Sequence, residues 1–227
     1  MLEQYGLAVD KAVCLVLDKR IDMWNGLDEE CQRHGILAEP FFCGCGDDKD
    51  IEYDHIDTEE SPPVLPRSTS YPTWWNRPNA YNAWQCHKKI LQRARADGTQ
   101  SLLLLEDDSI FESDFHDVMK GASLENWQFD MLYLGWYSNG HLHNTPNKHV
   151  MAMRGGGGFH GVILNRRIIE LLAAVDPIGP YDWICGQIHH KKMNCYAIYP
   201  DVITQQDGHS YVEGHHLTKP RVQNRAV

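Results

Sequence analysis

The chain has 227 residues and a formal net charge of −10. This length suits one α/β domain with a sizeable core, and we expect residues 1–227 to form a single domain. The acidic excess argues against non-specific binding to nucleic acid or to an anionic membrane, because both need clustered Lys and Arg. No segment is apolar for long enough to cross a bilayer, and the first residues lack a signal-peptide pattern, so we expect a cytoplasmic protein without a membrane span.

Strands and helices alternate in the predicted order of elements. The expected strands are 11–17, 102–105, 129–135, 148–153, 159–164 and 195–199. The expected helices are 21–35, 79–96 with His87 in its apolar stripe, 166–175 with Asn165 as its N-cap, and 181–190. This alternation is typical of a doubly wound α/β domain, and the uninterrupted run Leu102–Leu105 indicates a strand buried on both faces of a mostly parallel sheet.

Four other segments are expected to be irregular. Residues 38–50 and 57–78 hold most of the turn-forming residues, and the second segment has the length and composition of a binding loop. The four glycines at 155–158 match no dinucleotide-binding or P-loop pattern. They predict a flexible loop or a close backbone approach to a ligand, and a plain flexible hairpin is the alternative. The polar segment 201–227 is expected to be a flexible C-terminal tail or lid.

The seven cysteines are an odd number and are scattered along the chain, which predicts reduced thiols. Cys43 and Cys45 form the one close pair. A zinc site usually has two spacer residues and a second pair, so we expect ordinary loop cysteines here.

Three adjacent carboxylates, Glu106, Asp107 and Asp108, follow the apolar run. They would repel one another unless a cation lies among them, and a hard divalent ion shared with phosphates suits oxygen ligands. The alternative is a solvated acidic turn that ends a strand.

Other candidate residues each allow two interpretations. Asp182 can favour the N-terminus of a short helix, or act as a base with its proton affinity raised by aromatic neighbours. His209 can be a third metal ligand or a solvated loop histidine. Trp136 is better placed than Trp74 and Trp75 to stack on a sugar ring, although all three can simply pack.

The order of these segments resembles that of the family-25 glycosyltransferases, which include lipooligosaccharide and procollagen galactosyltransferases. The resemblance spans roughly residues 11 to 212. The matching segments, in chain order, are 14–20 with the helix after it, 83–90, 103–108, 129–135, 158–167 and 180–183.

The resemblance implies a GT-A type nucleotide-sugar-binding fold. In that fold Glu106 and Asp108 take the roles of the two acids of an Asp-x-Asp element, His209 completes the metal shell, and Asp182 is the acceptor-side acid. The residues implied in donor binding are Leu17, Asp18, Arg20, Asp107 and His160.

These observations predict a metal-dependent glycosyltransferase that moves a hexose from a nucleotide-diphosphate sugar, UDP-linked, to an acceptor hydroxyl. The resemblance implies a saccharide or hydroxylated acceptor and inversion at the anomeric carbon. Mn²⁺ or Mg²⁺ would neutralise charge on the leaving diphosphate, and Asp182 would accept the proton of the attacking hydroxyl. Two alternatives stay open: a nucleotide-sugar- or carbohydrate-binding protein without catalysis, and a divalent-metal phosphohydrolase of nucleotide sugars.

Overall fold

The structure of the chain is a computed structural model. It describes residues 1–43, 78–137, 142–175, 181–189, 193–206, 208–210 and 215–217. Segment 44–77 lies outside the described residues, and with it lie most of the expected binding loop 57–78, Cys45, Trp74 and Trp75.

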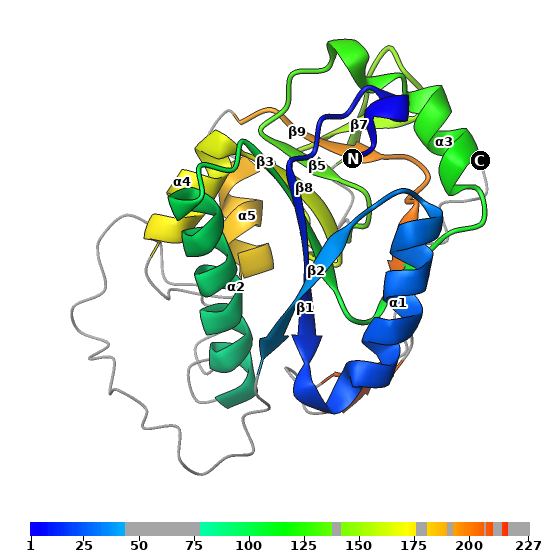
Figure 1. Cartoon of the computed structure of the whole chain (residues 1–227). Coiled ribbons are helices and arrows are strands. Elements are labelled where there is room, and N and C mark those ends of the chain that lie inside the picture. Colours follow the sequence, from blue (N-terminus) through cyan, green and yellow to red (C-terminus); the bar gives the residue numbers. More distant parts are fainter. Residues whose placement is uncertain are drawn as a thin grey trace.

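The centre of the fold is an 8-stranded sheet with the strand order β2-β1-β3-β8-β5-β9-β7-β6 (Figure 1). Its strands are β1 (Lys11–Leu17), β2 (Ala38–Cys43), β3 (Ser101–Glu106), β5 (Met131–Tyr133), β6 (Leu142–Asn144), β7 (Val150–Met153), β8 (Gly161–Asn165) and β9 (Cys195–Ile198). β1 runs parallel to β2 and β3, and β5 runs parallel to β9. β8 runs antiparallel to both of its neighbours, and β7 to β9 and β6. The predicted α/β class is confirmed, and the sheet is mixed.

Helices cover both faces of the sheet. They are α1 (Ile21–Arg33), α2 (Pro78–Ala96), α3 (Phe115–Ala122), α4 (Arg166–Ala174) and α5 (Tyr181–His189). Figure 1 shows α2, α4 and α5 on one side of the sheet and α1 and α3 on the other. Leu102 and Leu104 pack in the core on the α2 side, whereas Leu103 and Leu105 pack in the core on the α1 side. Burial on both faces explains why the run of leucines has no polar alternation. Among the described residues, no helix has the length and apolar character needed to span a membrane.

Several element boundaries differ from those that the sequence predicts. The turn residues of 38–50 predict a loop, and this is wrong for Ala38–Cys43, which forms the edge strand β2. Pro40 is tolerated there because an edge strand leaves one row of backbone groups unpaired. The predicted N-cap is confirmed, since the side chain of Asn165 accepts a hydrogen bond from the N–H of Ile168 at 3.2 Å.

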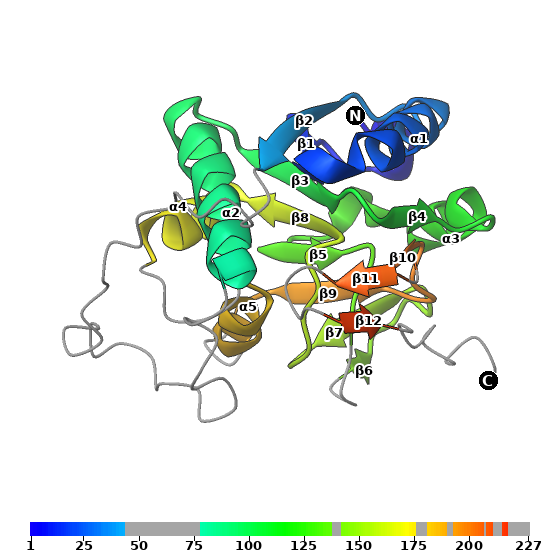
Figure 2. The same ribbon diagram turned by 90° about the horizontal axis from the view of Figure 1, so that it is seen from below.

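The C-terminal segment returns to the sheet edge where β3 ends. β10 (Ile203–Gln205) pairs antiparallel with the short strand β4 (Ser109–Phe111), as Figure 2 shows. Val202 and Ile203 are fully buried. The tail or lid expected from residue 201 therefore does not begin there, because 201–205 belong to the packed fold.

A disulfide joins the end of β2 to α2, between Cys43 and Cys86. The prediction of reduced thiols is wrong for this pair, because the two residues meet only once α2 packs beside β2. The described free cysteines, Cys14, Cys31, Cys185 and Cys195, are all buried.

Removing this disulfide should destabilise the protein. The bridge closes a separation of 43 residues, so the Cys43→Ser/Cys86→Ser variant should lose about 4 kcal/mol of unfolding free energy, chiefly because its unfolded chain gains entropy. Urea unfolding with and without dithiothreitol measures the loss. Reductant should lower the midpoint of the wild type to that of the variant and leave the variant unchanged. A wild-type midpoint insensitive to reductant would contradict the disulfide.

Candidate active site

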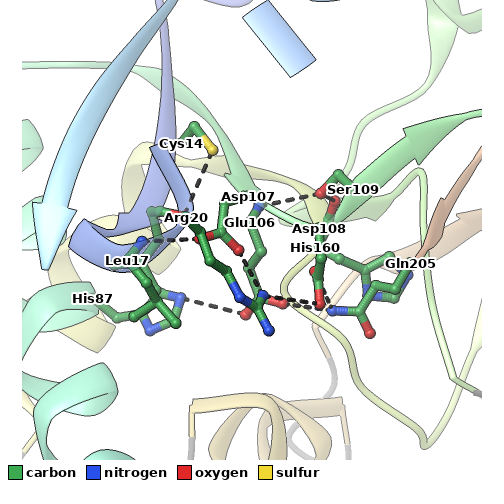
Figure 3. A network of polar contacts seen from close by, with 11 residues as sticks. Cys14, Leu17, Arg20, His87, Glu106, Asp107, Asp108, Ser109, His160 and Gln205 are labelled. Atoms are coloured by element: carbon green, nitrogen blue, oxygen red, sulfur yellow. Dashed lines mark hydrogen bonds and ion pairs between the residues drawn. The ribbon is translucent and has the colours of Figure 1, made fainter. Parts of the chain in front are cut away.

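The acid cluster lies at the edge of the sheet where β1 and β3 both end (Figure 3). Glu106 is the last residue of β3, and Asp107 and Asp108 form the turn into β4. Because β1 and β3 are parallel, their carboxyl ends reach the same edge, which is where ligands bind in open α/β sheets.

Asp107 ties the end of β3 to the end of β1. Its Oδ2 accepts a hydrogen bond from the N–H of Leu17 at 2.9 Å, and its Oδ1 accepts one from Nη1 of Arg20 at 2.9 Å. Burial raises the pKa of Asp107, while the Leu17 N–H and the Arg20 guanidinium oppose that rise. Asp107 thus positions the 3₁₀ turn Asp18–Arg20, in which Asp18 is exposed.

Glu106 and Asp108 converge on one point. Nε2 of Gln205 donates to Oε2 of Glu106 at 2.7 Å and to Oδ1 of Asp108 at 3.0 Å. Nη1 of Arg20 lies 3.7 Å from Oδ2 of Asp108. The backbone holds this arrangement, because the N–H of Gln206 donates to the carbonyl of Asp108 at 2.8 Å. The two acids predicted as metal ligands are therefore brought together.

His87 approaches the acids from α2, on the side opposite Gln205 in Figure 3. Its Nδ1 lies 2.9 Å from the carbonyl oxygen of Ala83, and its Nε2 lies 3.9 Å from Oε1 of Glu106. The ring packs against Phe159 and Tyr181, and burial lowers the pKa of His87 to about 4. His87 lies in the apolar stripe of α2 as predicted, and the stripe faces the site at this residue.

The pKa of Tyr137 responds to charges of both the acid cluster and α5. Burial raises the pKa of its hydroxyl, and the negative charges of Glu106, Asp108 and Asp182 raise it further. All three carboxylates therefore lie within electrostatic range of one phenol. Asp182 is exposed in the first turn of α5.

The glycine segment 155–158 allows a close approach between backbones. The N–H of Tyr137 donates to the carbonyl of Gly157 at 2.7 Å, and the N–H of Gly157 donates back at 3.0 Å. A Cβ on Gly157 would lie 3.0 Å from the carbonyl oxygen of Asp182, and Gly156 has a φ of +97°. The structure shows this segment in close approach to the chain itself, at Tyr137 and Asp182, and the expected approach to a ligand stays a prediction.

Two further residues that the sequence singled out, His160 and Trp136, are both buried. His160 is buried immediately before β8; its carbonyl accepts a hydrogen bond from the hydroxyl of Ser109 at 2.6 Å, and its ring centroid lies 5.0 Å from that of Tyr137. Trp136 is 1% exposed, and its Nε1 donates to the carbonyl of Ile198. Trp136 is therefore a core residue, so of its two interpretations the structure supports packing.

His209 lies in β11 (Gly208–Ser210), opposite His216 of β12 (His215–Leu217). Its side chain lies outside the described part of the chain. Among the residues that the structure describes, no group of three or more His, Cys, Asp or Glu side chains forms a ready metal site. The third metal ligand thus stays a prediction.

Sequence reasoning missed three residues of the site: His87, Tyr137 and Gln205. Gln205 lies in the same polar segment of the sequence as His209. Its amide side chain, at the end of a strand, could have indicated a site residue. Tyr137 directly follows Trp136, the tryptophan that the sequence placed best for a site, and this position was the available signal. His87 was the most predictable of the three, because it is a single titratable side chain among the apolar positions of its helix.

No protein-family model matches the chain, and no curated protein matches it. Solved structures with a similar fold include A197 from STIV, which is 13% identical with a TM-score of 0.38 over 82% of this chain and 81% of that one. A glycosyltransferase involved in the glycosylation of the major capsid of PBCV-1 is 10% identical with a TM-score of 0.42, over 89% of this chain and 96% of that one. The inositol-1-phosphate CTP transferase from T. maritima is 10% identical with a TM-score of 0.39, over 86% and 70%. At these values the similarity carries no information on substrate or reaction.

Proposed function

We propose that the chain is a GT-A type glycosyltransferase that moves a hexose from a nucleotide-diphosphate sugar, UDP-linked, to an acceptor hydroxyl with inversion. The observation that carries the proposal is the convergence of Glu106 and Asp108 on one point at the sheet edge. The order of sequence segments that resembles family-25 glycosyltransferases supports it.

The residues at this point fit a hard divalent cation, Mn²⁺ or Mg²⁺. The N–H hydrogens on Nε2 of Gln205 present partial positive charge to one oxygen of each carboxylate, with Nε2 at 2.7 Å from Glu106 and 3.0 Å from Asp108. A cation between the same oxygens would offset their repulsion more fully than an amide does. One or two carboxylates together with substrate phosphates are the usual ligands of Mg²⁺. When bound, the cation would neutralise charge that develops on the leaving diphosphate.

The chain's own side chains would supply the other functions. The guanidinium of Arg20 adds a fixed positive charge beside Asp108, at the edge where the diphosphate would lie. Asp182, exposed on α5, would accept the proton of the attacking hydroxyl. Leu17, Asp18 and His160 are proposed to contact the donor. His209 is proposed to approach the cation, and Asp107 to hold the donor-side turn in place.

A donor screen with and without Mn²⁺, with products identified by mass, tests the proposal. A glycosyltransferase releases UDP and a hexosylated acceptor. A phosphohydrolase releases UMP and a hexose phosphate, and a binding protein returns the donor intact. Either of the last two results would overturn the proposal.

Replacing Gln205 by lysine should exclude the cation. The Gln205→Lys ammonium would occupy the point between Glu106 and Asp108, so we expect Mn²⁺ affinity to fall on the order of 100-fold. The electron paramagnetic resonance signal of free Mn²⁺ measures the affinity. Gln206→Lys is the matched control, because Gln206 is the exposed next residue. Equal Mn²⁺ binding by Gln205→Lys and the wild type would place the cation elsewhere.

A further inference from the structure

Two histidines from different helices meet on the α1 side of the sheet, away from the acid cluster. His34 follows the last residue of α1, and His116 lies in the first turn of α3. Their ring centroids are 4.8 Å apart. The His34 ring also stacks on Phe111 of β4, at 4.6 Å and 15°, and contacts Phe115 of α3 at 4.5 Å. The end of α1 is therefore joined to α3 and β4 through one imidazole ring.

The surroundings of His34 suit an uncharged ring. Only 12% of its side chain is exposed, and its Nε2 lies 3.8 Å from Oε2 of Glu30, which is too long for a hydrogen bond. In the part of the chain that the structure describes, its Nδ1 is buried without a hydrogen-bond partner. A charged imidazole carries a proton on both nitrogens, so protonation would bury an N–H that has no acceptor.

His116 is the exposed member of the pair, so solvent reaches its ring. A hydrogen bond joins its Nδ1 to the hydroxyl of Tyr5, which belongs to the 3₁₀ turn η1 (Glu3–Tyr5). Tyr5 is itself 1% exposed and packs edge-on against Phe115. The His116 ring therefore cannot turn away from His34 without breaking its bond to a buried tyrosine.

The groups around His34 set the direction of its pKa. Burial lowers this pKa from its ordinary value of 6.5, and the charge of a protonated His116 lowers it further. On the same helix, Glu30 opposes the shift, whereas Arg33 adds to it. β4 contributes no charged residue. The titratable or charged residues of the other packed elements are Glu3 and Tyr5 of η1 and Asp117 and Lys120 of α3.

We propose that His34 and His116 form an acid-sensitive contact between α1 and α3. Uncharged rings pack together, whereas protons on both rings place two positive charges at this contact, and their repulsion weakens the packing of the end of α1 against α3 and β4. The unfolded chain binds the proton of His34 more readily than the folded chain, so the unfolding free energy falls as the pH drops below about 6.5. The inference is independent of the proposed function.

Urea unfolding of the full chain at about pH 7.5 and about pH 5.5 tests the contact. His34→Phe keeps a ring to stack on Phe111, and His116→Asn keeps a side-chain acceptor for the hydroxyl of Tyr5. Between the two pH values, the unfolding equilibrium constant of the wild type should rise roughly 5-fold or more beyond that of His34→Phe, because one proton taken up on unfolding changes it by up to about 10-fold per pH unit. His143→Gln, which replaces an exposed histidine of β6, is the control and should follow the wild type.

The double variant His34→Phe/His116→Asn completes a thermodynamic cycle. If the two charges repel, the coupling between the rings becomes more unfavourable to folding at the lower pH. A proton NMR titration of the wild-type histidine rings measures the same effect without relying on the variants: the pKa of His34 should lie below 6.5 and should rise in His116→Asn. A His34 pKa at or above 6.5 would overturn the inference. So would a coupling that is equal at both pH values, or a His34→Phe variant as acid-sensitive as the wild type.

Discussion

Asp108→Asn should abolish sugar transfer and leave the chain folded. Asp108 is mostly buried, with 13% of its side chain exposed. Its Oδ1 accepts a hydrogen bond from Nε2 of Gln205, which also donates to Oε2 of Glu106. Asparagine keeps the shape and can still accept from Gln205, but it removes the charge that a cation needs. We expect Mn²⁺-dependent turnover to fall on the order of 10³-fold or more.

Stability should respond differently from activity in this variant. Asp108→Asn loses an ion pair with Arg20 at 3.7 Å but also relieves repulsion from Glu106 and Asp107. The two effects oppose each other, so the melting temperature should stay the same or rise. Product formation, Mn²⁺ binding and thermal unfolding are measured together, with Asp117→Asn, an exposed carboxylate on α3, as the control. Near-wild-type turnover in Asp108→Asn would refute the metal assignment.

Asp182→Asn should slow turnover by about 10²- to 10⁴-fold, the usual loss when a positioned general base is removed. Glu106 and Asp108 are engaged with each other through Gln205, and in the proposed function Asp182 of α5 is the base. Asparagine also suits a helix N-terminus, so the fold of α5 should be retained. The affinities for UDP and Mn²⁺ should remain nearly unchanged.

The control for Asp182→Asn is Asp22→Asn. Asp22 is an exposed carboxylate in the first turn of α1, as Asp182 is in the first turn of α5. A loss shared by both variants would reflect helix stability. Should Asp182→Asn weaken UDP binding as much as it slows turnover, Asp182 is a donor-binding or structural residue and the base lies elsewhere.

The parts of the fold that sequence patterns predict are those with local causes. The strand Lys11–Leu17 and the acid-ended strand were visible because each is a continuous apolar run buried on both faces. The cap at Asn165 was visible because capping involves neighbouring residues. The edge strand β2 was missed because its exposed residues, Glu39, Pro40 and Phe42, carry no apolar alternation.

The sequence predicts only part of the candidate site, because some residues that contact one another there are far apart in the sequence. Glu106 and Asp108 stand next to each other, but Gln205 reaches them only through the antiparallel pairing of β10 with β4. Cys43 and Cys86 likewise meet only after α2 has packed against the sheet. Such contacts depend on topology, which short motifs do not encode.

The pairing of β10 with β4 also sets an order of events in biosynthesis. Glu106 and Asp108 precede Gln205 by 99 and 97 residues, so they leave the ribosome long before the amide that donates hydrogen bonds to both. During that interval the acidic turn has Arg20 as its cationic neighbour from the chain already made. Long-range pairings form late because the loop between them must close first. The acid pair therefore acquires its final geometry only after Gln205 has been made.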